Sequence, residues 1–287
     1  MTPYTLTEPT CLSFSGGRTS AFMLHEVLRC NADADVFKWL VVCFANTGKE
    51  EEATLRFVRE CGIQWGVGIH WLEWTKDGYN EVTFDTASRN GEPFESLIRH
   101  RSYLPNPVTR FCTSELKIRT MHRFLRANWE SFGWDSDDVE WDQMIGIRAD
   151  ESRRVAKIKA RGHSTETVSE SMLMPLASAG VTVGDVQKFW DKQSFHLELA
   201  TYKGRTLAGN CDLCFLKPAA QLQSLINEKP QRAVWWARME SLALASKPSG
   251  DVFRADRPSY SSMLANAESQ VDMYGYDEDQ TECFCGD

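Results

Sequence analysis

The chain has 287 residues, of which 42% are hydrophobic and 25% charged, and its formal net charge is −8 at pH 7. These values are ordinary for a soluble globular protein and allow one sizeable core, or a core domain with a smaller appendage. They exclude a generally adhesive polycation, although a local basic face can still bind nucleic acid. No apolar run approaches the roughly 20 residues that span a bilayer, and the N-terminus lacks the basic start and apolar stretch of a signal peptide. We therefore expect a cytoplasmic protein that does not enter a membrane.

The first quarter of the chain alternates between strand-like and helical patterns. Cys11 to Phe14 has the character of a short buried strand, and it runs through a glycine-rich turn into an apolar helical segment, Ala21 to Leu28. The alternation continues with a continuous apolar run at 37–44, helical spacing at 50–61 and another strand-like run at 67–74. This order predicts an α/β protein with a doubly wound, mostly parallel sheet and a site at the carboxyl ends of its strands.

The remaining chain predicts a second, helical region. Residues 80–107 suggest a long loop with one short helix, 113–129 a helix, 141–147 a buried strand, and 181–190 a turn followed by a helix. Beyond residue 205 the pattern changes to a CxxC, two helical stretches at 218–227 and 230–245, and an acidic tail at 274–287. We therefore expect an α/β domain over 1–204 and a cysteine-containing helical region over 205–287.

The segment from Ser15 to Ser20, Ser-Gly-Gly-Arg-Thr-Ser, is the most informative hexapeptide of the chain. Its two glycines let the backbone approach an anion closely, and successive amides with the following helix N-terminus form a cradle for phosphate. Ser13 and the two serines of the segment add hydroxyl groups, while Arg18 supplies a fixed charge with fork geometry. The segment matches neither the GxxxxGK[ST] loop nor the GxGxxG dinucleotide loop. Its place between a buried strand and an amphipathic helix predicts a phosphate-binding loop.

This hexapeptide resembles the PP-loop SGGxDS of the ATP pyrophosphatases, with Thr19 where aspartate is usual and Arg18 where lysine is common. Further motifs follow in the order found in the phosphoadenosine-phosphosulfate (PAPS) reductase-like PP-loop proteins, which belong to the adenine nucleotide alpha-hydrolase-like superfamily. They are Asn46-Thr-Gly-Lys-Glu50, Arg110-Phe-Cys-Thr113 with Leu116-Lys117, Gly146-Ile-Arg-Ala-Asp-Glu-Ser152, and Pro175-Leu176 with Asp185-Val186 and Trp190. The resemblance extends from about residue 10 to about residue 215. It also includes PAPS-reductase-family proteins of phages and bacteria.

The resemblance implies a nucleotide site built from the residues of these motifs. Those expected to contact the nucleotide are Ser13, Ser15, Gly16, Gly17, Arg18, Thr19, Ser20, Asn46, Thr47, Gly48, Arg110, Lys117, Gly146 and Arg148. Those expected to act in catalysis are Arg18, Ser20, Arg148 and Cys112. The cations would meet phosphate oxygens, with Mg²⁺ as a further counterion. The alternative is that these arginines form surface ion pairs with the acidic residues at 50–52 and 150–151. Trp190 is expected in the core.

The nine cysteines fall into two groups. Four stand singly in apolar segments and are expected to be small buried hydrophobic residues: Cys11, Cys30, Cys43 and Cys61. The other five need a chemical explanation, because disulfides are rare in a reducing cytosol. They are Cys112 in a polar stretch, Cys211 and Cys214 in a CxxC, and Cys283 and Cys285 in a CxC of the tail.

Three explanations for these five cysteines stay open. A [4Fe–4S] cluster would use Cys112, Cys211, Cys214 and one tail cysteine, because related proteins with such a cluster combine a CxxC with a cysteine near the RxC segment. A zinc site would use Cys211, Cys214, Cys283 and Cys285 and leave Cys112 free. The third is redox thiols without a metal, because the tail Thr-Glu-Cys283 resembles the ECGLH-like ending of PAPS reductases, without its Gly-Leu and histidine.

Three functions follow from these expectations. The first is ATP-dependent adenylation coupled to sulfur transfer onto a nucleic acid or related substrate, with DNA and tRNA as the substrate classes of the relatives. The second is thiol-dependent reduction of PAPS or APS to sulfite, and the third is a non-catalytic nucleotide-binding module. A sulfur- or electron-donor protein and a homo-oligomer stay open as partners. The basic run from Arg153 to Arg161 suggests either a nucleic-acid face or, by default, a solvated loop.

Overall fold

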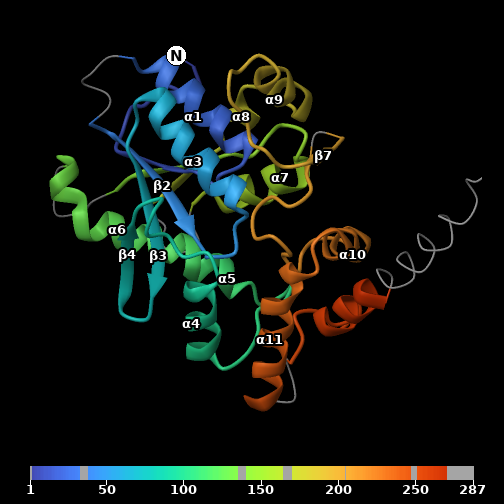
Figure 1. The fold of residues 1–287 in the computed structure, drawn as a ribbon. Helices are drawn as coiled ribbons and strands as arrows, with labels where there is room; N and C mark the ends of the chain where they lie inside the picture. The colour runs from blue at the N-terminus through green and yellow to red at the C-terminus, as the bar shows by residue number, and fades with distance from the viewer. Residues whose placement is uncertain are drawn as a thin grey trace, which may run out of the picture.

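The computed structural model describes residues 2–32, 38–134, 140–163, 170–203, 205–246 and 251–269 (Figure 1). Its strands are β1 (Thr10–Ser13), β2 (Leu40–Asn46), β3 (Ile69–Thr75), β4 (Gly78–Val82), β5 (Asp142–Ile145), β6 (Ser171–Leu173), β7 (Thr201–Tyr202) and β8 (Arg205–Thr206). Its helices are α1 (Arg18–Cys30), α3 (Glu52–Trp65), α4 (Glu92–Arg101), α5 (Phe111–Thr113), α6 (Thr120–Asn128), α7 (Ser152–Arg161), α8 (Pro175–Ser178), α9 (Val183–Trp190), α10 (Ala219–Glu228) and α11 (Gln231–Ser246). A further helix covers 260–269. Cys283 and Cys285 lie outside the described residues.

A six-stranded sheet, in the order β4-β3-β2-β1-β5-β6, confirms the predicted α/β, doubly wound, mostly parallel architecture. β1 lies between two parallel neighbours, with Leu12 opposite Val42 of β2 and Met144 of β5. The chain moves outward from β1 to β3 and then returns to the other side of β1 with β5. The strand order therefore reverses between β1 and β5, and ligands of open α/β sheets bind outside the carboxyl ends of the strands at such a point.

Helices cover both faces of the sheet. Successive side chains of a strand point to opposite sides, so neighbouring strand residues pack in different clusters. Leu12 of β1 and Phe44 of β2 belong to a cluster that includes buried residues of α1, α3 and α9. The adjacent Cys11 and Cys43 belong to a second cluster, which includes Met121 and Phe124 to Leu125 of α6. The apolar runs of the sequence are therefore strands covered on both faces, as predicted.

Three segments differ from the sequence prediction. β4 lies in a stretch predicted as a loop, because an edge strand without a buried residue carries no apolar run. α7 forms where a solvated loop was the default. Between α5 and α6 the helix contains a π-helical segment, Ser114–Arg119, which shifts the side chains beyond it relative to a regular α-helix.

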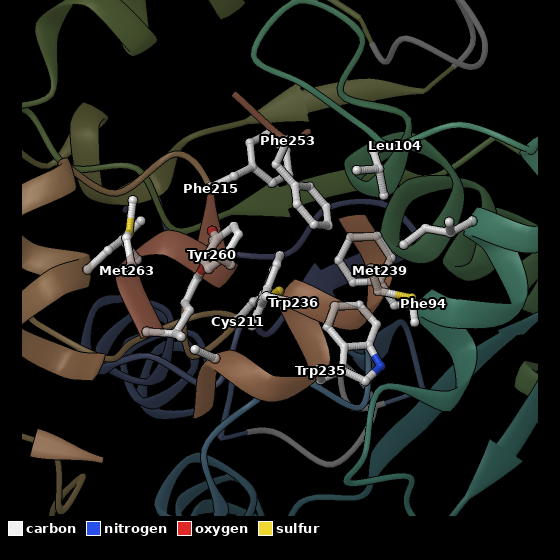
Figure 2. Packing of buried hydrophobic residues seen from close by; sticks show 14 of the residues in the cluster. Phe94, Leu104, Cys211, Phe215, Trp235, Trp236, Met239, Phe253, Tyr260 and Met263 are labelled. Carbon is white, nitrogen blue, oxygen red and sulfur yellow. Dashed lines mark hydrogen bonds between the residues drawn. The ribbon is translucent and has the colours of Figure 1, made fainter. Parts of the chain in front are cut away.

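The carboxyl-terminal helices pack against α4 and the start of the α5 segment (Figure 1). Phe94 of α4 lies 5.3 Å, ring centre to ring centre, from Trp235 of α11. Trp236 stacks on Tyr260 of the last helix at 5.2 Å. Figure 2 shows these aromatic side chains with Cys211 of the CxxC among them. The helical region thus buries its apolar surface on the sheet domain, and the boundary at 204/205 stays a prediction. In the described part of the chain, no helix has the length and apolar character needed to cross a bilayer.

Candidate functional site

The glycine-rich loop connects β1 to α1 at the edge where the strand order reverses. Gly16 has a φ of +72°, and a Cβ at this position would lie 2.7 Å from the Thr54 side chain, so glycine is required there for packing. Gly17 immediately precedes α1, and a Cβ on it would meet only the Ser15 hydroxyl, at 3.6 Å. The absence of a side chain at Gly17 is therefore not explained by packing. It leaves open space at the helix N-terminus.

The hydroxyl groups of the loop hold its backbone in place. Ser20 Oγ donates to the Gly17 carbonyl at 3.0 Å, accepts the Ser15 amide at 3.2 Å and lies 2.9 Å from Ser15 Oγ. Within the described residues, no hydrogen-bond acceptor is recorded for the amides from Gly16 to Ser20, and the first turn of α1 contains no acidic residue. Such a turn is a receptive site for an anion.

Arg18 connects the glycine-rich loop to a segment that is distant in the sequence. Its guanidinium donates to the carbonyls of Leu197 and Leu199, at 2.5 and 3.3 Å, and to the Thr206 hydroxyl at 3.2 Å. Partial burial lowers the pKa of Arg18. The Trp190 indole, buried as predicted, donates to the Arg18 carbonyl at 2.9 Å. Arg18 therefore belongs to the glycine-rich loop and also holds the segment that follows α9 in place.

Arg148 follows the end of β5 and contacts the glycine-rich loop. Its Nη1 donates to the Thr19 hydroxyl at 3.0 Å, while its Nε forms a 2.9 Å bond with Asp150. Gly146, just after β5, is in close contact with the loop, because a Cβ there would lie 3.1 Å from the Ser20 Cα. The structure therefore brings Arg148, Gly146 and the loop together as predicted. The expected alternative, pairing of Arg148 with nearby acidic residues, also occurs, and both contacts coexist.

The turn after β2 lies at the same sheet edge and is ordered by its own side chains. Asn46 is buried and donates to Glu73 at 2.6 Å, while its Oδ1 accepts the Gly48 amide at 3.1 Å. The Thr47 amide and hydroxyl both donate to the Glu50 carboxylate at 2.9 Å. The side chains of Asn46 and Glu50 are thus used to shape the turn. Thr47 also contacts a residue beyond this motif.

This turn contacts the CxxC directly. Thr47 Oγ1 lies 3.5 Å from Cys211 Sγ, and Glu50 forms an isolated antiparallel bridge with Cys211. The Asp212 amide donates to the Lys49 carbonyl at 2.7 Å, and the two side chains form an ion pair at 3.2 Å. The CxxC is therefore fixed at the sheet edge that carries the glycine-rich loop. It does not belong to a separate surface of the helical region.

Cys112, Cys211 and Cys214 lie near enough for their charges to interact. Burial, together with negative charge on Cys214, raises the pKa of Cys112 to about 11, although the Lys117 ammonium opposes the shift. Burial and Glu50 raise the pKa of Cys211, again against Lys117. The structure thus assembles three of the five predicted thiols around one lysine. Among the described residues, however, no group of three or more His, Cys, Asp or Glu side chains is arranged to hold a metal ion.

The remaining predicted residues take simpler positions. Arg110 is exposed at the start of α5, and its charge favours the thiolate of Cys112. Ser13 ends β1 opposite Cys43 and Ile145. The single cysteines Cys11, Cys43 and Cys61 are buried, as predicted, whereas Cys30 is half-buried at the end of α1.

Sequence reasoning missed several residues that build the site. Lys217 donates to the carbonyls of Gly209 and Cys211 at 2.8 and 2.6 Å, and burial lowers its pKa. It places a second ammonium group at the CxxC. The π-helical segment that carries Lys117 was also missed, and such insertions are frequent at functional sites. The only sequence signal for Lys217 was its place three residues after the CxxC.

Comparison with known proteins gives a likeness but no activity. No family model matches the chain. Over 222 residues it is 26% identical to an uncharacterized nin region protein, ORF290, of Escherichia phage lambda. This alignment covers 74% of the present chain and 67% of the phage protein. The fold and the site therefore define an α/β protein with a glycine-rich loop and a thiol cluster at one sheet edge.

Proposed function

We propose that this protein is a PP-loop adenine-nucleotide enzyme of sulfur chemistry, which uses ATP to activate an oxygen of its substrate for replacement by sulfur. The contact between Thr47 and Cys211 is the observation that carries the proposal. It joins a turn of the nucleotide-binding edge to the CxxC. A protein that only bound a nucleotide would have no need for thiols at that position.

In this proposal the free amides of the loop hold phosphate groups of ATP. The open space at Gly17 admits them, and the helix N-terminus favours their negative charge. Arg148, held by Thr19 and Asp150, is close enough to the loop to supply a cation with fork geometry. Mg²⁺ would neutralise the remaining charge when bound with the nucleotide.

The proposed reaction has two steps. An oxygen of the substrate attacks the α-phosphorus of ATP, and the bond to pyrophosphate breaks. A hydrosulfide ion then attacks the carbon that bears the adenylated oxygen, and AMP leaves with that oxygen. The contribution of the loop is electrostatic, because negative charge accumulates on the α-phosphate and on the departing pyrophosphate.

The thiols would bind and orient the sulfur-carrying group. Cys112, Cys211 and Cys214 supply three ligands, and a tail cysteine would supply a fourth to a [4Fe–4S] cluster. With four cysteine ligands such a cluster would supply electron transfer, and only with the tail cysteine absent would it leave one iron open to sulfide. Lys117 and Lys217 place positive charge beside the thiolates, which offsets the cost of burying them.

A second function is favoured by the same CxxC. If the loop binds PAPS or APS, a Cys112 thiolate attacks the sulfur atom of the sulfonucleotide and the nucleotide phosphate leaves. A second thiol, Cys214, then attacks the sulfur of Cys112 and releases sulfite with formation of a disulfide. The third function, a nucleotide-binding module without turnover, accounts for the loop but leaves the thiol cluster unused.

Turnover of ATP to AMP and pyrophosphate, measured anaerobically with Mg²⁺ and candidate nucleic acids, tests the proposal. Ser20→Ala should reduce turnover about 100-fold, because Ser20 fixes the loop through three contacts. Ser241→Ala, on α11, is the matched control and should have no effect. Sulfite release from PAPS without ATP turnover would instead establish the second function. Nucleotide binding without either reaction would establish the third.

A further inference from the structure

α7 is a basic helix on an acidic protein. Five of its ten residues are lysine or arginine, none is acidic, and none of its side chains is buried. The whole chain has a formal net charge of −8, so this concentration of positive charge is local. A helix that packs so little apolar surface is not explained by the needs of the core. The charge suggests a polyanionic partner.

Only part of the positive charge of α7 is used in contacts within the protein. Arg153, Lys157 and Arg161 follow one another at four-residue spacing and therefore share one face of the helix. Arg161 donates to the His163 carbonyl at 2.6 Å, and Arg154 pairs with Glu151 at 2.5 Å. Among the residues that the structure describes, no acidic side chain pairs with Arg153 or Lys157. Both side chains are exposed and available to phosphate groups.

The helix is anchored on the phosphate loop. Glu151 precedes α7 and accepts the Arg148 amide at 3.1 Å. Arg148 in turn donates to Thr19, in the first turn of α1. A partner that lies along α7 would therefore come close to the sheet edge that carries the glycine-rich loop.

The β7–β8 hairpin contacts Arg18, which precedes Thr19 in the first turn of α1. Arg18 donates to Thr206 of β8, which pairs with β7. Tyr202 of β7 is 63% exposed. The ammonium group of Lys203, the residue after β7, lies 5.3 Å from the centre of the tyrosine ring. An exposed aromatic ring beside a cation is a common platform for an unpaired base.

We propose that α7 and the β7–β8 hairpin bind single-stranded nucleic acid and present it to the phosphate loop, with phosphates on Arg153 and Lys157 and a base on Tyr202. The proposal rests on the proposed function only in assigning this strand as the substrate. The combination of free cations and an exposed aromatic ring favours an unpaired strand over an acidic protein, because stacking needs an accessible base.

The test measures binding without a nucleotide cofactor. The probe is a labelled single strand of mixed sequence, about 20 nucleotides long, as DNA and as RNA. Arg153→Gln/Lys157→Gln should weaken binding at least about tenfold and reduce the slope of log K against log salt by about 1.4, two contacts at about 0.7 each. Arg123→Gln/Lys76→Gln removes the same charges from α6 and the β3–β4 turn, and should change neither quantity.

The hairpin is tested separately. Tyr202→Ala should weaken binding about tenfold without changing the salt slope, and Tyr202→Phe should bind as the wild type does, because the ring is what stacks. Equal binding by the α7 variant and its control, no binding by the wild type, or equal affinity for poly-glutamate would overturn the proposal. ATP binding is measured on the same samples by calorimetric titration. Loss of strand binding with normal ATP binding, or the reverse, therefore separates failure of this inference from failure of the proposed function.

Discussion

Lys49 and Asp212 form an ion pair at 3.2 Å, and each side chain is about nine-tenths buried. The two residues belong to the turn after β2 and to the CxxC, so the pair connects this edge of the sheet with the thiol cluster. Asp212 also accepts the Trp236 indole at 2.9 Å, and Lys49 lies 5.1 Å from the centre of the Trp235 ring. The pair is thus enclosed by aromatic side chains of α11.

Removing one member of this pair should be costly. Lys49→Met leaves the Asp212 carboxylate buried without its counterion, and we expect a loss of about 3 kcal/mol in the free energy of unfolding. Asp212→Asn in the same chain removes that charge and keeps an acceptor for the Trp236 indole, so the double variant should be less destabilised than the sum of the single variants. Urea unfolding followed by tryptophan fluorescence measures both. Additive effects would show that the pair contributes no coupling.

The metal content of the protein tests the thiol cluster. Anaerobically purified protein should be brown, with about four irons and four sulfides per chain. Cys211→Ser should lose the iron, whereas Cys30→Ser, which changes a half-buried thiol at the end of α1, should keep it. One zinc per chain would make the cysteines structural instead. Iron unchanged in Cys211→Ser would show that the ligands are other residues.

Glu240 should give the carboxyl-terminal region a characteristic pH dependence. Its buried carboxylate accepts the amides of Tyr260 and Phe253, at 2.9 and 3.4 Å, and so holds the last helix on α11. Burial raises the pKa of Glu240 above its ordinary value of 4.5. The unfolded chain therefore releases this proton first. The free energy of unfolding should fall as the pH rises from about 4.5 through the raised pKa.

The variants at Glu240 separate charge from hydrogen bonding. Glu240→Gln removes the titration and should abolish this part of the pH dependence. Glu240→Ala leaves both amides without an acceptor and should cost about 2 kcal/mol or more at every pH. Denaturant midpoints between pH 4 and 8, a range chosen to span the titration, provide the measurement. An unchanged pH profile in Glu240→Gln would mean that other carboxyl groups control it.

Local patterns predicted the centre of the fold. The apolar runs that became β1, β2 and β5 are buried on both faces, so their signal is strong, and the glycine-rich segment occupies the loop that it predicted. β4 and α7 were not predicted, since neither contributes much to the core and neither has an apolar pattern. Exposed elements depend on strand pairing and on charge, and these produce weaker sequence patterns than burial in the core does.

The site was predicted only as separate motifs. The sequence singled out Thr47, Lys117 and the CxxC, but their meeting depends on packing between residues that are distant in the chain, such as Thr47 and Cys211, which are 164 positions apart. The π-helical segment that positions Lys117 has no local sequence signature. Arg18 was predicted at the phosphate, and the structure shows it bound to the carbonyls of Leu197 and Leu199. The sequence alone does not indicate whether Arg18 binds phosphate or backbone carbonyls.

The central claim is that the loop binds an adenine nucleotide, and calorimetric titration with ATP and PAPS tests it most directly. The wild type should bind one molecule of ATP or PAPS per chain and should bind GTP at least about tenfold more weakly. Gly17→Val should bind neither nucleotide and should unfold as the wild type does, because its side chain enters open space at the helix N-terminus. Gly16→Ala is the contrasting variant and should be destabilised by at least about 1 kcal/mol, because φ is +72° and Thr54 is in the way. No binding of ATP or PAPS by the wild type, or equal binding by Gly17→Val, would contradict the account.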